Sequence, residues 1–515
     1  MGKGLELNTF KADLNAGFSV ALVALPLSIG ISLASGAPAS SGLIAAIIGG
    51  LIGSWLGGTQ MTINGPAAGL IVIVLEAILT LGHGDSVQGF KGMLAASVVA
   101  GAFQILFGAL KFGRKGSAFP ASVIHGMMAA IGLIIIAKQA HVLLGYAPIA
   151  KNPIMLFSEI PQAFSSLQPS IFGLGFSSLA LLMLWPRLPW QFTKKIPAPL
   201  ITVIFGAFGA HFIQLSPSAL LNIPSDLGQW IIFPDFSVMQ TFDGWRAAIT
   251  LALVASLETT LSASAIGKLD PMNRKCNLDR DLLSKGVCNM LSGSIGGLPM
   301  IAEIVRSSAN VGYKAKTWKS NFLHGVIVLF AVLALPSVLS LIPLASLAAI
   351  LLLVGSRLGS PSHFMHALKV GKDNLVGFLV TMVVTLAVDL LVGIFAGAVA
   401  QYLVEMYLGL KIKHTFKPSY DEKLTNLNVE VFTVESSLIF SNFVSLKEEI
   451  LKMKKLRRNV KLVLVGCEYI DHSVMDQISE LKHDFELCSL NFETELSKEH
   501  HSLGEDLLSS QKKSA

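Results

Sequence analysis

A carboxylate and a hydroxyl stand four residues apart inside an apolar segment. Glu258 lies in the middle of residues 246–267, and Ser262 follows it by one helical turn. Side chains four residues apart share one face of a helix. Oxygen ligands of this kind suit Na⁺, and a carboxylate in a membrane helix could instead carry a proton. The alternative is a structural hydrogen bond between helices.

A guanidinium stands in a second apolar segment. Arg306 lies within residues 301–311, and Glu303 precedes it by three residues. Because a guanidinium stays charged, Arg306 would suit an oxyanion. Glu303 could pair with Arg306 along the helix or take part in cation or proton coupling. Alternatively, the two charges only neutralise each other, or Arg306 extends to the cytoplasmic face.

Glycine and proline break two apolar segments about 230 residues apart. The breaks read Ile-Asn-Gly-Pro-Ala-Ala-Gly at 63–69 and Gly-Gly-Leu-Pro-Met-Ile-Ala at 296–302. Lipid tolerates irregular backbone only where protein or a cavity surrounds it. Each break therefore predicts a half-helix with free N–H groups and a positive dipole end near the bilayer midplane. Such a pair indicates an anion site. The expected anion-binding residues are Asn64, Gly65, Pro66, Ala67, Ala68, Met300, Ile301, Ala302 and Arg306.

The elements that position these side chains are membrane helices. The chain is 52% hydrophobic and 14% charged, with a mean hydropathy of +0.63, whereas soluble domains are about 25% charged. We predict an all-α polytopic membrane protein of fourteen spans, built as two inverted repeats of seven, about 14–214 and 246–408. The spans are 14–33, 41–57, 65–80, 92–110, 119–137, 171–187, 198–214, 246–267, 281–294, 301–311, 320–340, 343–356, 374–388 and 390–408.

Basic residues cluster in alternate loops and predict the orientation. They occur in the loops 111–115, 187–195, 268–280, 314–319 and 357–372. With fourteen spans these loops lie on one side, and the positive-inside rule makes that side, with both termini, cytoplasmic. The net charge of +6 then reflects topology and needs no nucleic-acid partner. We find no nucleophile–base pair, metal cluster or phosphate loop, so we expect neither an enzyme nor a cofactor.

The polar composition after residue 410 predicts a cytosolic domain. We divide the chain into a tail at 1–13, a transporter domain at 14–410, a linker at 411–426, an α/β domain at 427–496 and a disordered tail at 497–515. Within the α/β domain, strands are expected at 429–434 and 461–465. Amphipathic helices are expected at 445–454 and 474–487.

Four motifs together resemble the SulP family of sulfate permeases and related anion exchangers. They are Ala24-Leu25-Pro26, Asn64-Gly65-Pro66, Ser256-Leu257-Glu258 and Arg306-Ser307-Ser308-Ala309-Asn310. The resemblance is strong over about 10–410 and weak over 425–495. The stretch from Gly296 to Asn310 is similar to the bacterial branch that is often fused to, or encoded beside, carbonic anhydrase.

The resemblance implies a core domain and a gate domain, with substrate bound between the third and tenth spans. It also implies a C-terminal STAS domain, a homodimer and a place in the bacterial inner membrane. Glu258 and Ser262 fall where a bicarbonate transporter of this family places its Na⁺ ligands, with Glu in place of Asp and Ser in place of Thr. We further expect Pro26 to break the first span.

We therefore expect secondary active transport of a small inorganic oxyanion, bicarbonate or sulfate, across the lipid bilayer by alternating access. Na⁺ or H⁺ would be the coupling ion. Leu27, which replaces a glutamine common in sulfate carriers, and the extra acid Glu303 favour bicarbonate. Three alternatives remain open: a C4-dicarboxylate transporter, a nucleobase:proton symporter of the same fold, and a membrane-anchored STAS signalling protein.

Overall fold

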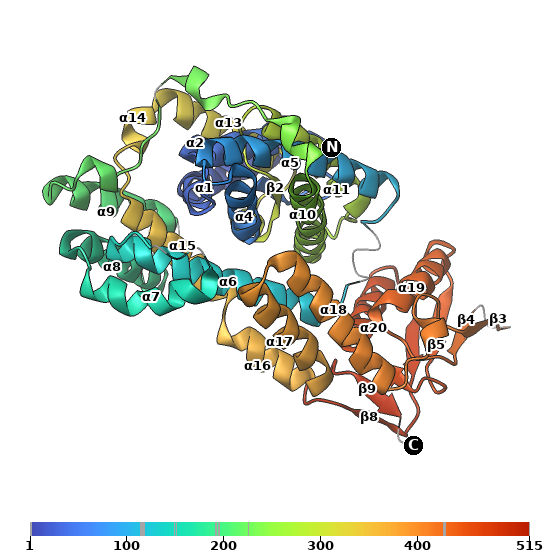
Figure 1. Ribbon diagram of the computed structural model, residues 1–515. Helices are drawn as coiled ribbons and strands as arrows, with labels where there is room; N and C mark the ends of the chain where they lie inside the picture. The colour runs from blue at the N-terminus through green and yellow to red at the C-terminus, as the bar shows by residue number, and fades with distance from the viewer. Residues whose placement is uncertain are drawn as a thin grey trace. The chain divides into compact units, whose positions relative to one another are not determined.

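The computed structural model describes residues 3–113, 119–148, 150, 152–190, 193, 196–224, 226–425 and 429–513. The chain forms two compact units, Met1–Gly116 with Ile131–Leu358, and Ser117–Ala130 with Gly359–Ala515. Figure 1 shows that helices dominate both units and that the C-terminal sheet belongs to the second. Four of the basic residues used to predict orientation, Arg114, Lys115, Lys194 and Lys195, lie outside the described residues.

Each apolar block predicted as a span overlaps a helix of the described chain. Within the described ranges, seven helices are long and apolar enough to cross a membrane, and shorter apolar helices accompany them. The polytopic helical fold with a small α/β domain is thus confirmed. The helices up to residue 358 are α1 (Lys3–Ala34), α2 (Ala39–Leu51), α3 (Gly53–Leu56), α4 (Ile71–Gly82), α5 (Ser86–Ala109), α6 (Ala121–Leu144), α7 (Pro153–Ser165), α8 (Pro169–Leu184), α9 (Ala198–Phe212), α10 (Phe242–Lys268), α11 (Leu278–Ser294), α12 (Ile304–Gly312), α13 (Lys319–Ala334), α14 (Pro336–Leu339) and α15 (Leu344–Leu358). In the second unit they continue as α16 (Pro361–Val370), α17 (Lys372–Ala387), α18 (Leu390–Tyr407), α19 (Phe440–Lys455) and α20 (His472–Glu486).

Two helical features differ from expectation. α1 runs without interruption through Pro26, so the expected break in the first span was wrong. Packed membrane helices tolerate an internal proline because neighbouring groups satisfy the freed backbone. The additional helix α7 begins at Pro153, after Asn152 caps it by accepting a hydrogen bond from the Ile154 N–H at 2.9 Å. Asparagine followed by proline is a helix-start signal that the hydropathy pattern concealed.

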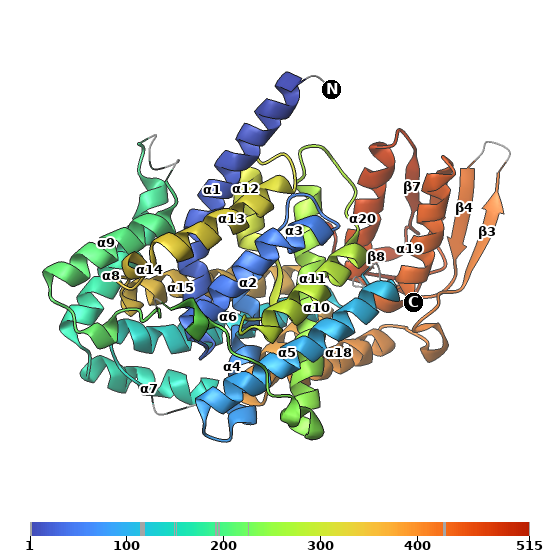
Figure 2. The same ribbon diagram turned by 90° about the horizontal axis from the view of Figure 1, so that it is seen from above.

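The C-terminal domain is a four-stranded mixed sheet with two helices. Its strands are β3 (Tyr420–Leu424), β4 (Val429–Val434), β5 (Asn459–Val463) and β7 (Phe492–Glu495), in the order β3-β4-β5-β7. β3 pairs antiparallel with β4, and the other two pairs are parallel. Figure 2 shows α19 and α20 beside this sheet, and the two helices contact each other. Buried Phe432, Leu446, Leu462 and Phe485 lie in its core.

Both flanks of this domain differ from the sequence expectation. β3 lies inside the segment 411–426 that we expected to be a linker. The tail expected to be disordered forms β8 (His500–Ser502) and β9 (Gln511–Lys513), which build a second sheet with β6 (Tyr469–Ile470). The Glu505 N–H donates to the Lys369 carbonyl at the end of α16 at 2.8 Å. Helix-terminal carbonyls need such donors, and Leu503 of the tail also packs against the buried cluster of Leu410, Ile439, Phe440 and Tyr469, so hydrogen bonds and apolar packing together order the polar tail.

Asp471 precedes α20 and is buried, and neither carboxylate oxygen forms a hydrogen bond of good geometry among the described residues; the nearby hydroxyl and N–H of Ser473 offset the effect of burial only in part. Burial raises the pKa of this carboxyl from 3.8 to about 6, and the charge of Asp373 adds to the rise. Because the folded pKa exceeds the unfolded one, the protonated form contributes stability at low pH. That contribution is lost as the pH rises through about 6.

Asp471→Asn is therefore expected to stabilise the C-terminal domain above pH 6 by about 1–3 kcal/mol. It should also flatten the pH dependence of stability between pH 4 and 7. Hydrogen exchange of α20 in the full chain, corrected for intrinsic rates, measures both effects. The exposed Asp476→Asn on the same helix is the control. Unchanged pH dependence in Asp471→Asn would contradict the assignment.

Candidate functional site

The two predicted breaks meet as a short antiparallel strand pair. β1 (Ile63–Pro66) and β2 (Met300–Glu303) form a two-stranded sheet in which Asn64 lies opposite Ala302 and Gly65 opposite Ile301. Both strands are buried, so the pairing satisfies backbone groups that lipid could not. The sequence predicted the breaks but not the strands. The half-helices consequently begin a few residues later than expected, at Ala68 with a 3-10 turn before α4 and at Ile304 with α12.

Arg306 is the third residue of α12, and its side chain extends toward β1. Its side chain is 0% exposed, and its Nη2 donates to the Pro66 carbonyl at 3.3 Å. Nε and Nη1 have no hydrogen-bond partner within the part of the chain that the structure describes. A Cβ at Gly65 would lie only 2.6 Å from Nη1, so glycine permits this approach. The structure thus holds a buried guanidinium with two unused donor atoms beside both strands.

Glu303 caps α12. Its Oε2 accepts a hydrogen bond from the Arg306 backbone N–H at 2.6 Å, and the described side chains of Glu303 and Arg306 form no direct ion pair. We expected the N–H groups at the start of this half-helix to be free; for the Arg306 N–H, which bonds to Glu303, this expectation was wrong. A carboxylate at a helix N-terminus also offsets the positive dipole end. The fixed positive charge left in this region belongs to Arg306.

Glu258 is half-buried on α10, among buried neighbours of the same helix, and lies against the start of the other half-helix. A Cβ placed on Gly69 would lie 1.8 Å from Glu258 Oε1 and 2.4 Å from Oε2. The carboxylate therefore occupies the space that the missing side chain leaves. Ser262 is buried one turn further along α10. Nearby, the hydroxyls of Ser256, which belongs to the Ser256-Leu257-Glu258 motif, and of Thr259, which was not predicted, are buried and have no hydrogen-bond partner among the described residues.

The remaining predicted residues contribute backbone and packing. Ala67 and Ala68 are buried between β1 and α4. Met300, Ile301 and Ala302 are buried in β2. Asn64 is buried and donates from Nδ2 to the Gly49 carbonyl at 3.2 Å, while its Oδ1 meets no donor among the described side chains and backbone.

Three polar residues that position the strands were not predicted as site residues. Ser307 Oγ accepts from the Ile63 N–H at 2.8 Å, and Asn310 Nδ2 donates to the Met61 carbonyl at 3.0 Å. Asn289 on α11 accepts from the Met300 N–H at 2.7 Å and donates to the Met300 carbonyl at 3.1 Å. An asparagine inside an apolar block was the available signal for Asn289, because such a group needs a buried partner.

Asn289→Ala is expected to destabilise the protein by about 1–3 kcal/mol, because the buried Met300 N–H and Gln104 Oε1 lose their partners. Looser positioning of β2 should also lower the rate of solute uptake. Thermal unfolding and uptake measured on the same preparation test both effects. Ser294→Ala is the control, since its hydroxyl bonds only within α11, to the Met290 carbonyl. Wild-type stability and uptake in Asn289→Ala would contradict the positioning role.

Comparison with known sequences relates this arrangement to a family of transporters. A model of the sulfate permease family matches residues 10–383. The putative sulfate transporter YvdB of Bacillus subtilis is 25% identical over 483 residues, which cover 92% of this chain and 88% of YvdB. The bicarbonate transporter BicA of Picosynechococcus sp. is 26% identical over 356 residues, which cover 68% of this chain and 62% of BicA.

Solved structures show the same fold. The transmembrane domain of a cyanobacterial bicarbonate transporter, BicA, gives a TM-score of 0.65 at 24% identity and covers 76% of this chain and 97% of that domain. The structure of SLC26A9 gives a TM-score of 0.70 at 15% identity and covers 95% of this chain and 84% of SLC26A9.

Proposed function

This chain belongs to the sulfate permease family, and from that premise we propose that it is a secondary active transporter of a small inorganic oxyanion, bicarbonate or sulfate. The observation that carries the proposal is Arg306, a buried guanidinium beside β1 and β2 whose Nε and Nη1 find no hydrogen-bond partner among the residues described. A buried donor atom without a hydrogen-bond partner is costly. An oxyanion that accepts hydrogen bonds from both nitrogens would remove that cost.

Glu258 is the proposed coupling group. Its carboxylate lies against Gly69, at the start of the half-helix that follows β1. An ionised carboxylate in this position would oppose anion binding by like-charge repulsion. Binding Na⁺ with help from Ser262, or binding a proton, would neutralise it and so link anion and cation occupancy. Alternating access would then move the neutralised site across the membrane.

Bicarbonate is favoured over sulfate by charge balance. The cap formed by Glu303 places a second carboxylate on the helix that carries Arg306. A monovalent anion meets less repulsion from this group than a divalent one. The proposal includes a homodimer in the bacterial inner membrane with cytoplasmic termini, and a functional link to a carbonic anhydrase.

Uptake into proteoliposomes tests the proposal. Labelled bicarbonate and labelled sulfate are supplied separately, each with and without an inward Na⁺ gradient at fixed pH. Na⁺-dependent bicarbonate uptake that loses its Na⁺ dependence in Glu258→Gln supports the full scheme. Uptake driven only by a proton gradient would assign Glu258 to proton coupling instead. Absence of flux for both anions would overturn the proposed substrate class.

A further inference from the structure

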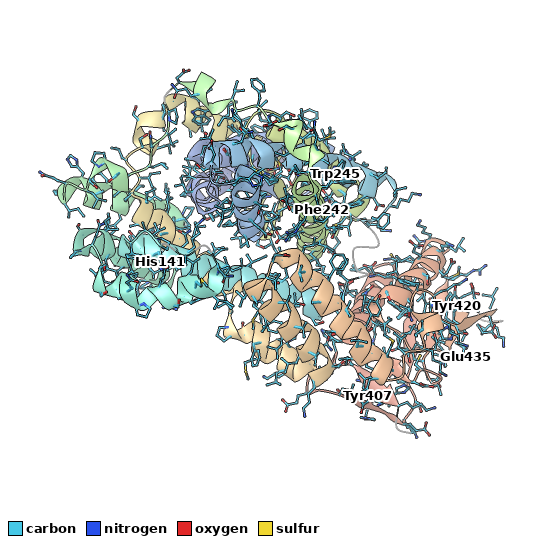
Figure 3. The ribbon with its side chains drawn as sticks, in the orientation of Figure 1. His141, Phe242, Trp245, Tyr407, Tyr420 and Glu435 are labelled. Atoms are coloured by element: carbon cyan, nitrogen blue, oxygen red, sulfur yellow. The ribbon has the colours of Figure 1, made fainter. Side chains whose placement is uncertain are left out.

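The segment that joins α18 to the C-terminal sheet presents large apolar side chains to solvent. Tyr407, at the end of α18, is 86% exposed, and Figure 3 labels it there. Ile412 and Phe416 on the following segment are 77% and 78% exposed. Few large apolar side chains of the described chain are as exposed, and these three fall within ten residues of one another. A cluster of exposed apolar side chains of this kind marks a surface that binds a membrane or another molecule.

This segment is held in place, so its apolar side chains cannot simply turn inward. Leu410 is buried against Ile439, Phe440 and Tyr469. Three side chains from the start of α19 or just before it bind backbone carbonyls of the segment. These bonds are Ser437 Oγ to Gly409 O at 3.1 Å, Asn442 Nδ2 to His414 O at 2.8 Å and Ser441 Oγ to Thr415 O at 2.6 Å. The outward direction of Ile412 and Phe416 is therefore built into the fold.

The same segment is basic. Lys411, Lys413 and Lys417 alternate with the apolar side chains, and residues 407–419 contain no Asp or Glu. All three lysines are exposed. Among the described residues, Lys411 forms an ion pair with Glu468 at 3.5 Å, whereas Lys413 and Lys417 form none. Two positive charges are thus available to an external anion.

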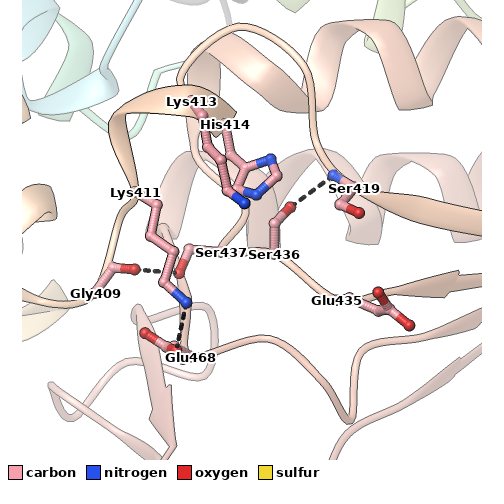
Figure 4. Close-up of a pocket in the computed structure, with 9 residues that line it drawn as sticks. All are labelled: Gly409, Lys411, Lys413, His414, Ser419, Glu435, Ser436, Ser437 and Glu468. Carbon is pink, nitrogen blue, oxygen red and sulfur yellow. Dashed lines mark hydrogen bonds and ion pairs between the residues drawn. The ribbon is translucent and has the colours of Figure 1, made fainter.

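A pocket of about 230 Å³ lies under this basic stretch (Figure 4). Lys413 and His414 line it together with the hydroxyl groups of Ser436 and Ser437. Ser436 Oγ already accepts from the Ser419 N–H at 2.9 Å. Glu435 and Glu468 also line the pocket, and Glu468 is the residue paired with Lys411. The pocket is large enough for one phosphate group with part of its ester.

We propose that residues 407–417 form an anchor that binds anionic phospholipid headgroups at the membrane surface. Tyr407, Ile412 and Phe416 enter the interfacial layer, where aromatic and aliphatic side chains are stable. Lys413 and Lys417, which form no ion pair among the described residues, bind headgroup phosphates, and Lys413 does so at the edge of the pocket. The anchor fixes the C-terminal domain to the bilayer surface.

Proximity and charge favour a bilayer over a protein partner. Ile412 is five residues beyond the end of α18, so a fully extended chain would place it at most about 18 Å from the helix end. The headgroup layer is roughly 5–8 Å thick on each side of the hydrocarbon core, so the segment starts beside it. A second copy of this surface would bring like-charged lysines together, whereas an anionic leaflet neutralises them.

Depth-dependent quenching of a fluorescent label tests the anchor in the full chain. Bimane is attached to Ile412→Cys or Phe416→Cys in a Cys276→Ser/Cys488→Ser background, because Cys288 and Cys467 are buried. The protein is reconstituted in nanodiscs of phosphatidylcholine, with or without phosphatidylglycerol, that carry a shallow spin-labelled lipid. Leu456→Cys at the end of α19 gives the reference for an exposed site outside the anchor.

We expect the two anchor labels to be quenched several-fold more than the Leu456→Cys label, and only in discs with phosphatidylglycerol. Each lysine strengthens binding to an anionic surface about fivefold, so Lys413→Gln/Lys417→Gln, which leaves the Lys411–Glu468 ion pair in place, should abolish the difference. The charge-matched Lys452→Gln/Lys455→Gln on α19, which removes two exposed lysines, should retain it.

Three outcomes would overturn the anchor. Equal quenching with and without phosphatidylglycerol would show that the segment contacts the membrane without binding anionic headgroups. If the labels are not quenched by the spin-labelled lipid but are still quenched by a water-soluble quencher, the segment lies in water and does not bind the membrane. Cross-linking between labelled copies in place of quenching identifies a second chain as the occupant. Uptake is measured separately, so failure of the anchor leaves the proposed transport function untouched.

Discussion

Arg306→Ala is expected to lower kcat/KM for anion uptake by about 100-fold or more while the protein still folds. The variant removes the two unpaired donors, Nε and Nη1, that we assign to the anion. The cap of α12 survives, because Glu303 bonds to the backbone N–H of residue 306 and not to its side chain. The hydrogen bond to Pro66 is lost, which removes one link between α12 and β1.

Uptake is compared with thermal stability and elution volume on one preparation. Arg280→Ala is the matched control, since this exposed arginine of α11 bonds only to the Leu56 and Trp55 carbonyls in the described chain. Arg306→Lys keeps the charge but loses the planar fork, so we expect intermediate uptake. If Arg306→Ala transports at a rate near wild type, Arg306 is a structural residue and the site lies elsewhere.

Gly69→Ala is expected to reduce uptake roughly tenfold or more, because a methyl group at this position would overlap the Glu258 carboxylate. The carboxylate must then leave the start of the half-helix. We expect the dependence on the coupling ion to weaken together with the rate. Initial uptake rates over a series of Na⁺ concentrations and pH values measure both.

A double-mutant cycle separates this effect from general damage. If Gly69→Ala acts through Glu258, adding it to Glu258→Gln should cost little more than Glu258→Gln alone. Gly173→Ala on α8 is the control, because nothing lies within 4 Å of its added Cβ. Additive losses, or a normal ion dependence in Gly69→Ala, would contradict the placement of the carboxylate.

The helices and the two breaks could be predicted from the sequence because both are local properties. Apolar block length gave the spans, and Gly65-Pro66 and Leu298-Pro299 gave the positions where regular helix stops. The pairing of β1 with β2 could not be predicted in this way. Each strand is only four residues long, and the partner that satisfies its backbone comes from the other half of the chain.

Some site residues could likewise be identified from the sequence, whereas the contacts that define their roles could not. A charged residue in an apolar segment was enough to select Arg306 and Glu258. The distinction between Glu303 as a partner of the Arg306 side chain and as a cap for its backbone depends on one rotamer, which spacing does not reveal. The contact between Glu258 and Gly69 joins segments that are 189 residues apart, and no local pattern encodes it.

The strand pair also has a consequence for biogenesis. Ile63 lies opposite Glu303, 240 residues further along the chain. At a synthesis rate of about 5–20 residues per second, β1 is made roughly 12–50 s before its partner. During this interval Asn64 can bond to Gly49, but the strand edge remains open inside the bilayer. Each newly inserted molecule therefore passes through an intermediate in which β1 is unpaired, and membrane chaperones and proteases can recognise this intermediate. The intermediate ends when the second repeat is inserted and β2 pairs with β1.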